Sequence, residues 1–222
     1  MKLSSQYCYG LTATHERKYG HGVLTELCIG PLLAELKQSD HESTQALTID
    51  VVTSKLTLPF RYKTDHYETL AKTICYDSTR NSLVTKQILK QVKRKKRVLV
   101  LTERKDHIEI LSLHLRTNAE LLTLSGDDSA ASRKLKLKQI EAGNFEVLLA
   151  TGQLFGEGID ITGFDVLVLA FPVAFEGKLK QYIGRLRGEG VKQIIDIHDE
   201  DVEFLDRQFK KRQKVYDTLL EN

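Results

Sequence analysis

Two stretches of the sequence combine the residue types that bind phosphate groups. The first, LLATGQLFGEGIDI at residues 148–161, is an apolar run that continues into a segment with glycines and acidic residues. This pattern is typical of a buried strand that delivers a loop to a ligand site at its carboxyl end. The second, QYIGRLRG at residues 181–188, places two arginines beside a glycine at what we predict to be the start of a helix. Paired guanidinium donors and a helix amino end both suit phosphate oxygens, so the two stretches predict nucleotide and nucleic-acid chemistry.

The composition sets broad limits on the class of protein. The chain has 222 residues, of which 41% are hydrophobic and 28% charged, as is usual for a globular protein. Its net charge of +3 and isoelectric point near 8.6 permit a polyanionic partner without requiring one. The three cysteines are odd in number and lack metal-ligand spacing, which indicates a reducing, cytoplasmic compartment. No apolar run approaches the roughly 18 residues of a membrane span, so we expect no membrane contact.

The first part of the chain, residues 1–65, is predicted to be connector material with modest structure. It holds a weak helical pattern at residues 23–37 and an alternating strand candidate at residues 47–60. Beyond it, apolar residues recur at helical spacing. We therefore place a domain boundary near residue 65 and predict a second domain over residues 66–222.

The second domain alternates strictly between strand and helix patterns. The predicted strands are 98–102, 120–124, 147–151, 166–171 and 193–198, and the predicted helices are 105–116, 129–142, 179–184 and 202–220. The helix over 129–142 is closed by Gly143 and Asn144 as a carboxyl cap. The strands are nearly continuous apolar runs, which predicts burial on both faces in a parallel sheet with helices on either side. The fold class is therefore α/β, with five or six strands.

Ligands of such sheets bind where the carboxyl ends of the strands meet. The segments predicted to reach that edge are polar and rich in glycine, and they are 102–104, 125–127, 151–160, 171–172 and 198–199. The basic runs 93–97 and 134–138 are interpreted as solvated helix faces, and the alternative is that they contact nucleic acid. His107 and His114 are expected on the flank of a helix, so the sequence predicts no metal site.

These pieces, taken together and in order, resemble the motifs of a known family. The segments that carry the resemblance are GLTATHER at 10–17, VLVLTERKDH at 98–107, LSGDDSAASR at 124–133, LLATGQLFGEGID at 148–160 and QYIGRLRG at 181–188. The chain resembles the second RecA-like domain of superfamily 2 helicases and translocases over nearly its whole length. It is most similar to the branch that contains restriction-enzyme motor subunits and DNA-repair helicases. The first segment resembles the motif that closes the first RecA-like domain, which implies a coupling role for Thr12 and Thr14.

The resemblance implies roles for the first phosphate-binding stretch. Thr151 would hold a nucleic-acid phosphate, and the residues implied to contact ATP there are Gly156, Glu157, Gly158 and Asp160. Asp160 would meet the nucleotide sugar and couple the two domains. The alternative for Thr151 is a threonine that merely ends a strand. Glycine clusters alone are weak signals, so the order of the motifs carries this interpretation.

The second stretch would supply the catalytic groups. Arg185 matches the arginine finger of the family, with Gln181 and Gly184 at the expected offsets, and the alternative is a surface arginine paired with an acid. Relatives usually carry a second arginine three positions beyond the first, but Gly188 stands there and the arginine is Arg187.

Further residues are implied to hold the nucleic-acid backbone at the other strand ends. They are Thr102, Arg104, Gly126 and Arg133. Their hydroxyl, guanidinium and backbone N–H groups are donors of the kind that phosphate oxygens accept. The resemblance to restriction and repair enzymes favours DNA over RNA as the partner.

A complete motor needs a Gly-Lys-Ser/Thr phosphate loop and an acidic magnesium motif, and the sequence contains neither. Gly177 and Lys178 are followed by Leu179, and the acidic run 199–201 lies past the last strand. We expect the first RecA-like domain to supply both motifs and to hold most of ATP and Mg²⁺, so this chain alone is expected to be inactive. The chain then resembles a carboxyl-terminal fragment or the product of a split gene. The alternatives are a non-catalytic nucleic-acid-binding or adaptor module and, less favoured by the glycine pattern, an α/β enzyme with a nucleotide cofactor.

Overall fold

The computed structural model divides into two units, Met1–Thr44 and Gln45–Asn222. It describes residues 10, 27–31, 33–34, 47–60, 62, 66–156, 163–173, 176–184, 186 and 192–220. In the first unit the described residues include one short helical segment, 27–29. The account below concerns the second unit, which holds the sheet.

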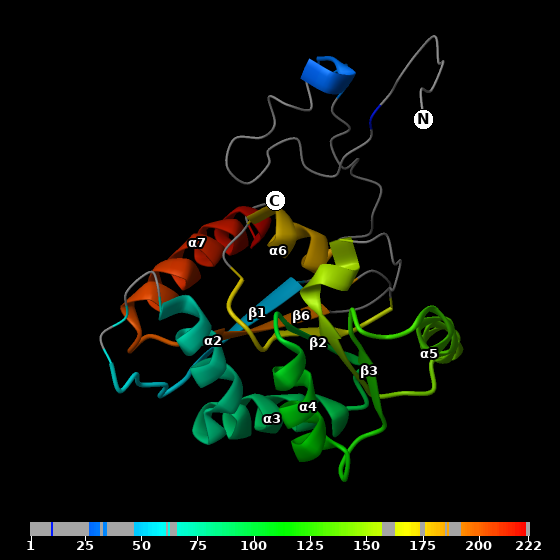
Figure 1. Ribbon diagram of the computed structural model, residues 1–222, viewed down its shortest axis with the longest axis horizontal. Coiled ribbons are helices and arrows are strands. Elements are labelled where there is room, and N and C mark those ends of the chain that lie inside the picture. The colour runs from blue at the N-terminus through cyan, green and yellow to red at the C-terminus, as the bar shows by residue number, and fades with distance from the viewer. Residues whose placement is uncertain are drawn as a thin grey trace. The chain divides into compact units, whose positions relative to one another are not determined.

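Six parallel strands form one sheet in the second unit (Figure 1). The strands are β1 Leu47–Thr53, β2 Val98–Thr102, β3 Leu121–Leu124, β4 Val147–Thr151, β5 Val166–Leu169 and β6 Lys192–His198, in the order β1-β6-β5-β2-β4-β3. The predicted α/β class and the predicted parallel sheet are confirmed, because every strand pair is parallel. β2 lies at the centre, and the chain passes first to one side of it and then to the other.

The strand β1 belongs to this sheet, although the sequence placed it in the connector. It pairs with β6 along its whole length, from Leu47 beside Lys192 to Thr53 beside His198. The compact unit therefore begins at Gln45, upstream of the boundary expected near residue 65. Alternating polarity revealed the strand, but its partner lies more than 140 residues away and leaves no local signal.

The helices pack against both faces of the sheet. They are α2 Tyr67–Tyr76, α3 Ser78–Val92, α4 Lys105–Leu115, α5 Ala130–Ala142, α6 Glu176–Ile183 and α7 Glu203–Leu220, with a 3₁₀ turn η3 at Gly152–Gly156. The predicted carboxyl cap of α5 is present, because Gly143 ends the helix at φ +72°. At the other end Ser129 lies outside the helix as its amino cap and accepts a hydrogen bond from the Ser132 N–H. One prediction was wrong. QYIGRLRG does not start a helix, because α6 begins at Glu176 and ends before Gly184.

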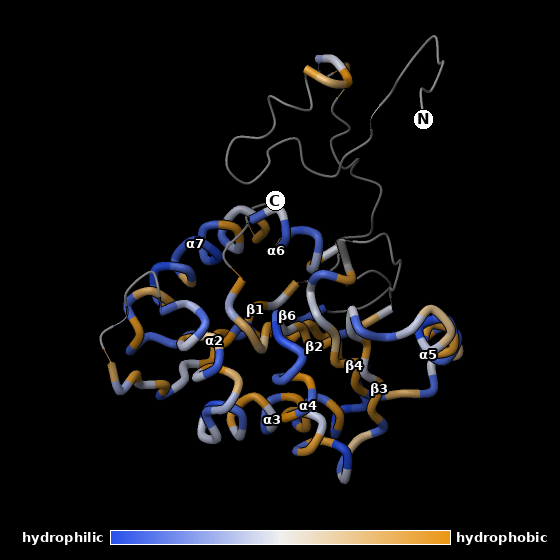
Figure 2. The backbone as a smooth tube through the Cα atoms, in the orientation of Figure 1, coloured by the Kyte–Doolittle hydropathy of each residue, from blue (hydrophilic) through white to orange (hydrophobic). Residues whose placement is uncertain are grey.

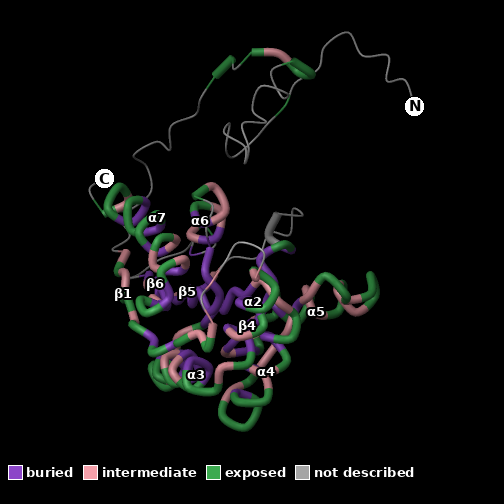
Figure 3. The backbone as a smooth tube through the Cα atoms, turned by 60° about the vertical axis from the view of Figure 1, so that its left-hand side comes forward, coloured by how far each residue is buried: buried purple, intermediate pink, exposed green. Residues whose placement is uncertain are grey.

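Alternate residues of each strand face different helix layers, as a period of two requires. In β2, Leu99 and Leu101 join the core beneath α5, α6 and α7, whereas Val98 and Val100 join the core beneath α3 and α4. Figure 2 shows the hydrophobic strands between more polar helices. The inner strands β2, β4 and β5 are buried along their whole length, whereas the edge strands β1 and β3 are partly exposed (Figure 3). The sheet is thus a rigid support for the loops at its carboxyl edge.

Two buried ion pairs fasten helices to that edge. Arg80 of α3 donates to both carboxylate oxygens of Asp199, at 2.8 and 3.1 Å, and to the Ala170 carbonyl at 2.7 Å. Arg212 of α7 makes the same bidentate contact with Asp196 of β6, at 2.7 and 3.0 Å. All four side chains are at most 3% exposed, so each buried charge is stabilised by its partner, and loss of either partner would leave an unpaired charge in the interior.

Candidate functional site

The sheet brings three of the predicted phosphate-binding segments side by side. β3, β4 and β2 are consecutive neighbours, and Thr102 and Thr151 are register partners at the ends of β2 and β4. Gly126 follows the end of β3 by two residues. The carboxyl ends of these three strands therefore present Gly126, Thr151 and Thr102 in that order along one edge.

The Thr102 hydroxyl is already engaged in a buried hydrogen-bond chain. It lies 2.9 Å from His107 Nδ1, and His107 Nε2 lies 2.9 Å from Asn81 Oδ1. Asn81 Nδ2 donates to the Cys75 carbonyl at 2.7 Å, which leaves Oδ1 as the acceptor facing His107. His107 is thus neutral with its proton on Nε2, and the Thr102 hydroxyl donates to Nδ1. The Arg104 N–H donates to the same hydroxyl at 3.4 Å.

His107 is completely buried, so its expected place on a helix flank was wrong, whereas His114 is exposed on the same helix. Burial, helped by the positive charge of Arg80, lowers the pKa of His107 from 6.5 to about 3. The unfolded chain binds this proton below about pH 6.5 and the folded chain does so only near pH 3. Stability is therefore lost as the pH falls through this window.

By the linkage relation, protonation of His107 in the unfolded chain should lower the free energy of unfolding by about 2 kcal/mol between pH 6.5 and pH 4.5. Urea unfolding at several pH values should show a smaller loss over this window in His107→Gln than in the unmodified chain. His114→Gln, on the same helix, should keep the steeper dependence. An equal pH dependence in the unmodified chain and in His107→Gln would contradict the neutral, buried state of His107.

Thr151 differs from Thr102 because its hydroxyl has no hydrogen-bond partner among the described residues, although its side chain is only 7% exposed. The Arg104 guanidinium already has a partner, because it donates to the Glu68 carboxylate of α2 at 2.7 Å. A phosphate at this edge would compete with Glu68 for Arg104. Of these residues, Thr151 is the one most ready to accept a new partner.

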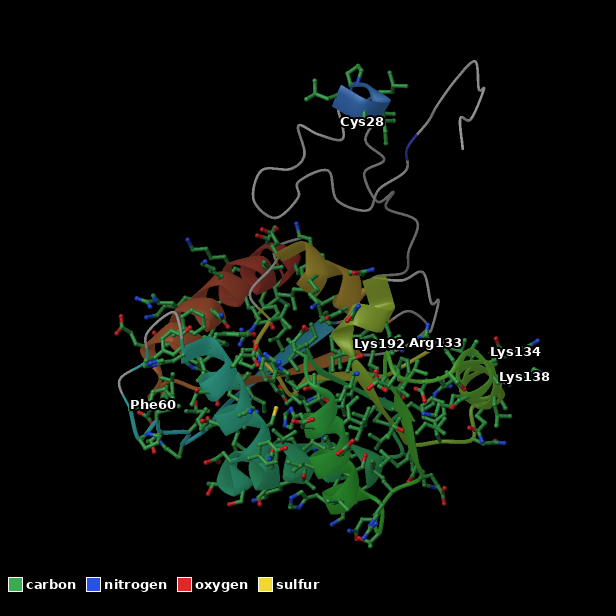
Figure 4. The ribbon with its side chains drawn as sticks, viewed as in Figure 1. Cys28, Phe60, Arg133, Lys134, Lys138 and Lys192 are labelled. Carbon is green, nitrogen blue, oxygen red and sulfur yellow. The ribbon has the colours of Figure 1, made fainter. Side chains whose placement is uncertain are left out.

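The turn that contains Gly126 is organised by Asp128. Its carboxylate accepts from the Ser125 N–H at 2.8 Å and from Lys136 at 2.5 Å. Partial burial by itself would raise the pKa of Asp128, but these bonds bring it below its usual value. Arg133 donates to the Gly126 carbonyl at 3.4 Å, so two residues that were each predicted to bind nucleic acid are in contact with one another. Figure 4 shows Lys134 and Lys138 on α5, projecting away from the sheet.

A cluster not foreseen from the sequence joins α6 to the strand ends. The Tyr182 hydroxyl is completely buried and donates to Glu103 at 3.2 Å, and Lys178 donates to the other Glu103 oxygen at 2.7 Å. A Cβ placed on Gly152 would lie 1.6 Å from the Tyr182 hydroxyl oxygen. Only glycine therefore permits this contact, which packs α6 against the residue that follows Thr151. Burial and the nearby Glu103 carboxylate raise the pKa of Tyr182 and keep it protonated.

The remaining predicted site residues lie at the end of α6 or beyond the part of the chain that the structure describes. Gln181 is half-buried in the last turn of α6, and Gly184 follows the helix as an exposed residue. The other predicted site residues lie outside the described residues. They are Thr12, Thr14, Glu157, Gly158, Asp160, Arg185 and Arg187. Gly156 is the last residue of η3.

Comparison with known proteins identifies the domain. Residues 79–188 match the helicase conserved C-terminal domain family. The chain contains a helicase C-terminal domain. The matched residues run from the first turn of α3 to the QYIGRLRG segment, so they include Glu103, Gly152 and Tyr182. The predicted resemblance to superfamily 2 helicase C-terminal domains is confirmed, and the restriction and repair branch stays a prediction.

Solved structures share the fold of this helicase C-terminal domain. T4 UvsW superimposes with a TM-score of 0.60 at 17% identity, over 78% of this chain and 39% of that one. S. cerevisiae Dbp5 bound to RNA and ADP BeF3 gives 0.57 at 16% identity, over 94% and 54%. The helicase MrfA bound to DNA and AMPPNP gives 0.54 at 15% identity, over 72% and 22%. These likenesses establish the RecA-like fold.

A protein of Acanthamoeba polyphaga mimivirus, whose name describes it as an ATP-dependent RNA helicase, is 25% identical over 231 residues. The match covers 97% of this chain and 42% of that protein. The chain therefore spans about two fifths of the length of this relative. None of the helices within the described residues is long and apolar enough to cross a membrane.

Proposed function

We propose that this chain is the C-terminal half of an ATP-dependent nucleic-acid helicase or translocase, and that it supplies the arginine finger and part of the backbone grip. The observation that best supports the proposal is the contact between Tyr182 and Gly152. It ties the helix that leads into Arg185 to the strand end that carries Thr151. ATP-driven movement along nucleic acid needs the arginine finger and the nucleic-acid contact to be held by the same rigid part of the domain.

In this proposal Arg185 stabilises the negative charge that develops on the γ-phosphate during hydrolysis. Gln181 would be a further catalytic residue. The residues that would bind ATP are Gly156, Glu157, Gly158, Asp160 and Gly184. Arg187 would be a second cation near the phosphates, and Thr12 and Thr14 would couple the two halves. Thr151 would hold a backbone phosphate through its hydroxyl, which has no partner among the described residues.

ATP and Mg²⁺ would be shared with a first RecA-like domain. The 222 residues contain no Gly-Lys-Ser/Thr phosphate loop. Within the described part of the chain, no group of His, Cys, Asp and Glu side chains could hold a metal ion. The residues present thus fit one side of the nucleotide, the side that a cationic finger approaches. The magnesium ion would neutralise phosphate charge from the other domain.

DNA is the proposed partner, on the strength of the resemblance to restriction and repair enzymes. The similar structures include one protein bound to RNA and one bound to DNA, and the mimivirus relative is named as an RNA helicase. A direct comparison therefore belongs in the test. Oligo(dT) and oligo(U) of equal length differ little in backbone charge, so different stimulation of ATP hydrolysis would report the preferred sugar and base.

We expect the purified 222-residue chain to hydrolyse ATP no faster than background, because the phosphate loop is absent. Joined to the first RecA-like domain of its longer protein, it should show ATP hydrolysis that either oligo(dT) or oligo(U) stimulates. A steady-state phosphate-release assay measures both. Stimulated turnover by the isolated chain would contradict the half-motor proposal. Binding of nucleic acid without hydrolysis in the joined protein would instead favour a non-catalytic adaptor module.

A further inference from the structure

An open groove of about 900 Å³ lies between α3 and α4, away from the motifs described above. Figure 1 shows these two helices side by side, on the opposite face of the sheet from α6 and α7. The groove is lined by Ser82, Thr85, Lys86, Gln87, Leu89, Lys90, Lys93, Arg94 and His114. None of these side chains is acidic.

The charge of the groove is continuous along α3. Lys86, Lys90, Lys93 and Arg94 are all exposed, and they recur at three- and four-residue intervals on one side of the helix. The sequence from Lys86 to Arg97 has seven basic residues and no acidic residue among twelve. Such a row of cations is complementary to a row of phosphates.

The floor of the groove has a donor without an acceptor. The Thr85 side chain is 8% exposed, and its hydroxyl oxygen has no hydrogen-bond partner. A buried hydroxyl without a partner is costly, and a threonine on a helix normally bonds to a carbonyl of the preceding turn. Thr85 lines the positively charged groove, and a small shift of its buried side chain would bring the O–H group to an anionic oxygen bound there.

We propose that the α3/α4 groove is a second nucleic-acid contact, in which the lysines and Arg94 hold phosphates of the backbone and Thr85 donates to a phosphate oxygen. Phosphate contacts in protein–nucleic acid complexes combine Lys and Arg with Ser, Thr and Gln donors, and this groove has the same mixture. Protein interfaces centre instead on aromatic or apolar anchors, and Leu89 is the one apolar residue in this lining. The groove therefore fits a polyanionic strand better than a folded protein partner.

The groove is separate from the edge that carries Thr151. Arg80, in the first turn of α3, binds Asp199 just beyond the carboxyl end of β6. From Arg80 to Lys93 the helix advances by about 20 Å, toward the amino ends of the strands. Nucleic acid bound at Thr151 and nucleic acid bound in the groove would thus contact the domain at two separate places. The proposal rests on the nucleic-acid-binding part of the proposed function and needs no arginine finger.

The test is the salt dependence of binding to a fluorescein-labelled dT20 oligonucleotide, measured by anisotropy with the 222-residue chain. For single strands the slope of log K against log salt is about −0.7 for each phosphate contact. Lys90→Gln/Lys93→Gln should therefore make the slope shallower by about 1.4. The matched control is Lys211→Gln/Lys214→Gln, two exposed lysines of α7 on the other face, which should change it far less. An unchanged slope in the groove variant, or an equal change in the control, overturns the proposal.

Thr85→Val separates a ligand contact from a structural role. Removal of an unpartnered buried hydroxyl should leave the melting temperature equal or higher, while affinity for dT20 falls about tenfold if a charged partner is lost. Unchanged affinity overturns the proposal, as does tighter, groove-dependent binding of a deca-glutamate peptide. If the unmodified chain does not bind dT20 at all, both the groove proposal and the nucleic-acid contact of the proposed function are contradicted. If the groove variants bind dT20 as the unmodified chain does, only the groove proposal is contradicted, and nucleic-acid binding elsewhere on the domain stands.

Discussion

Arg185→Ala should lower the turnover number of nucleic-acid-stimulated ATP hydrolysis by about a thousandfold in the protein that joins this chain to its first RecA-like domain. ATP affinity should change little, because a finger acts mainly on charge that develops in the transition state. The measurement is steady-state hydrolysis for the turnover number, with nucleotide binding measured separately under equilibrium conditions.

Two further arginines make the result interpretable. Arg207→Ala removes an exposed arginine of α7 that pairs with Glu203, and turnover should stay near normal. Arg187→Ala reports whether the displaced arginine acts as a second finger. Comparable losses would indicate two fingers, and normal turnover in Arg187→Ala would indicate one. Intact turnover in Arg185→Ala would refute the motif assignment.

Gly152→Ala should reduce turnover by about a hundredfold, because a displacement of roughly 1 Å at a catalytic group has effects of that order. The added methyl carbon would lie 1.6 Å from the Tyr182 hydroxyl oxygen, so the buried Tyr182 side chain, or α6 with it, must move. Overpacking of this kind also costs about 1–3 kcal/mol of folding stability. Steady-state hydrolysis and the melting temperature, measured on the same preparation, give both effects.

Gly126→Ala is the matched control for this substitution. Gly126 also lies at a strand end, but a Cβ there would meet no atom within 4 Å. Activity and stability should both be retained. Gly152→Ala/Tyr182→Phe should recover part of the loss, because the nearest remaining atom of residue 182 would be the ring carbon Cζ at 2.7 Å. Normal turnover in Gly152→Ala would mean that the contact does not position the finger.

The sequence by itself determined most of the domain. The apolar runs of β2, β4 and β5 predicted a buried parallel sheet, since strands covered on both faces need apolar residues at every position. The carboxyl cap at Gly143 was correctly predicted for α5, because capping depends on the residues at the helix end itself. The order of the motifs was enough to predict the helicase C-terminal domain. All of these signals are local in the chain.

Only the tertiary structure decided which distant residues meet. From the sequence alone, β1 is an isolated strand, and the structure shows that it pairs with β6. From the sequence alone, His107 is a helix-surface residue, and the structure shows that it is buried against Asn81 and Thr102. Likewise, nothing in the sequence distinguishes Gly152 from the other glycines, and only the structure shows that Tyr182 packs against it. Periodicity reports whether a side chain is buried but not which partner buries it. That choice depends on packing between elements that are far apart in the sequence.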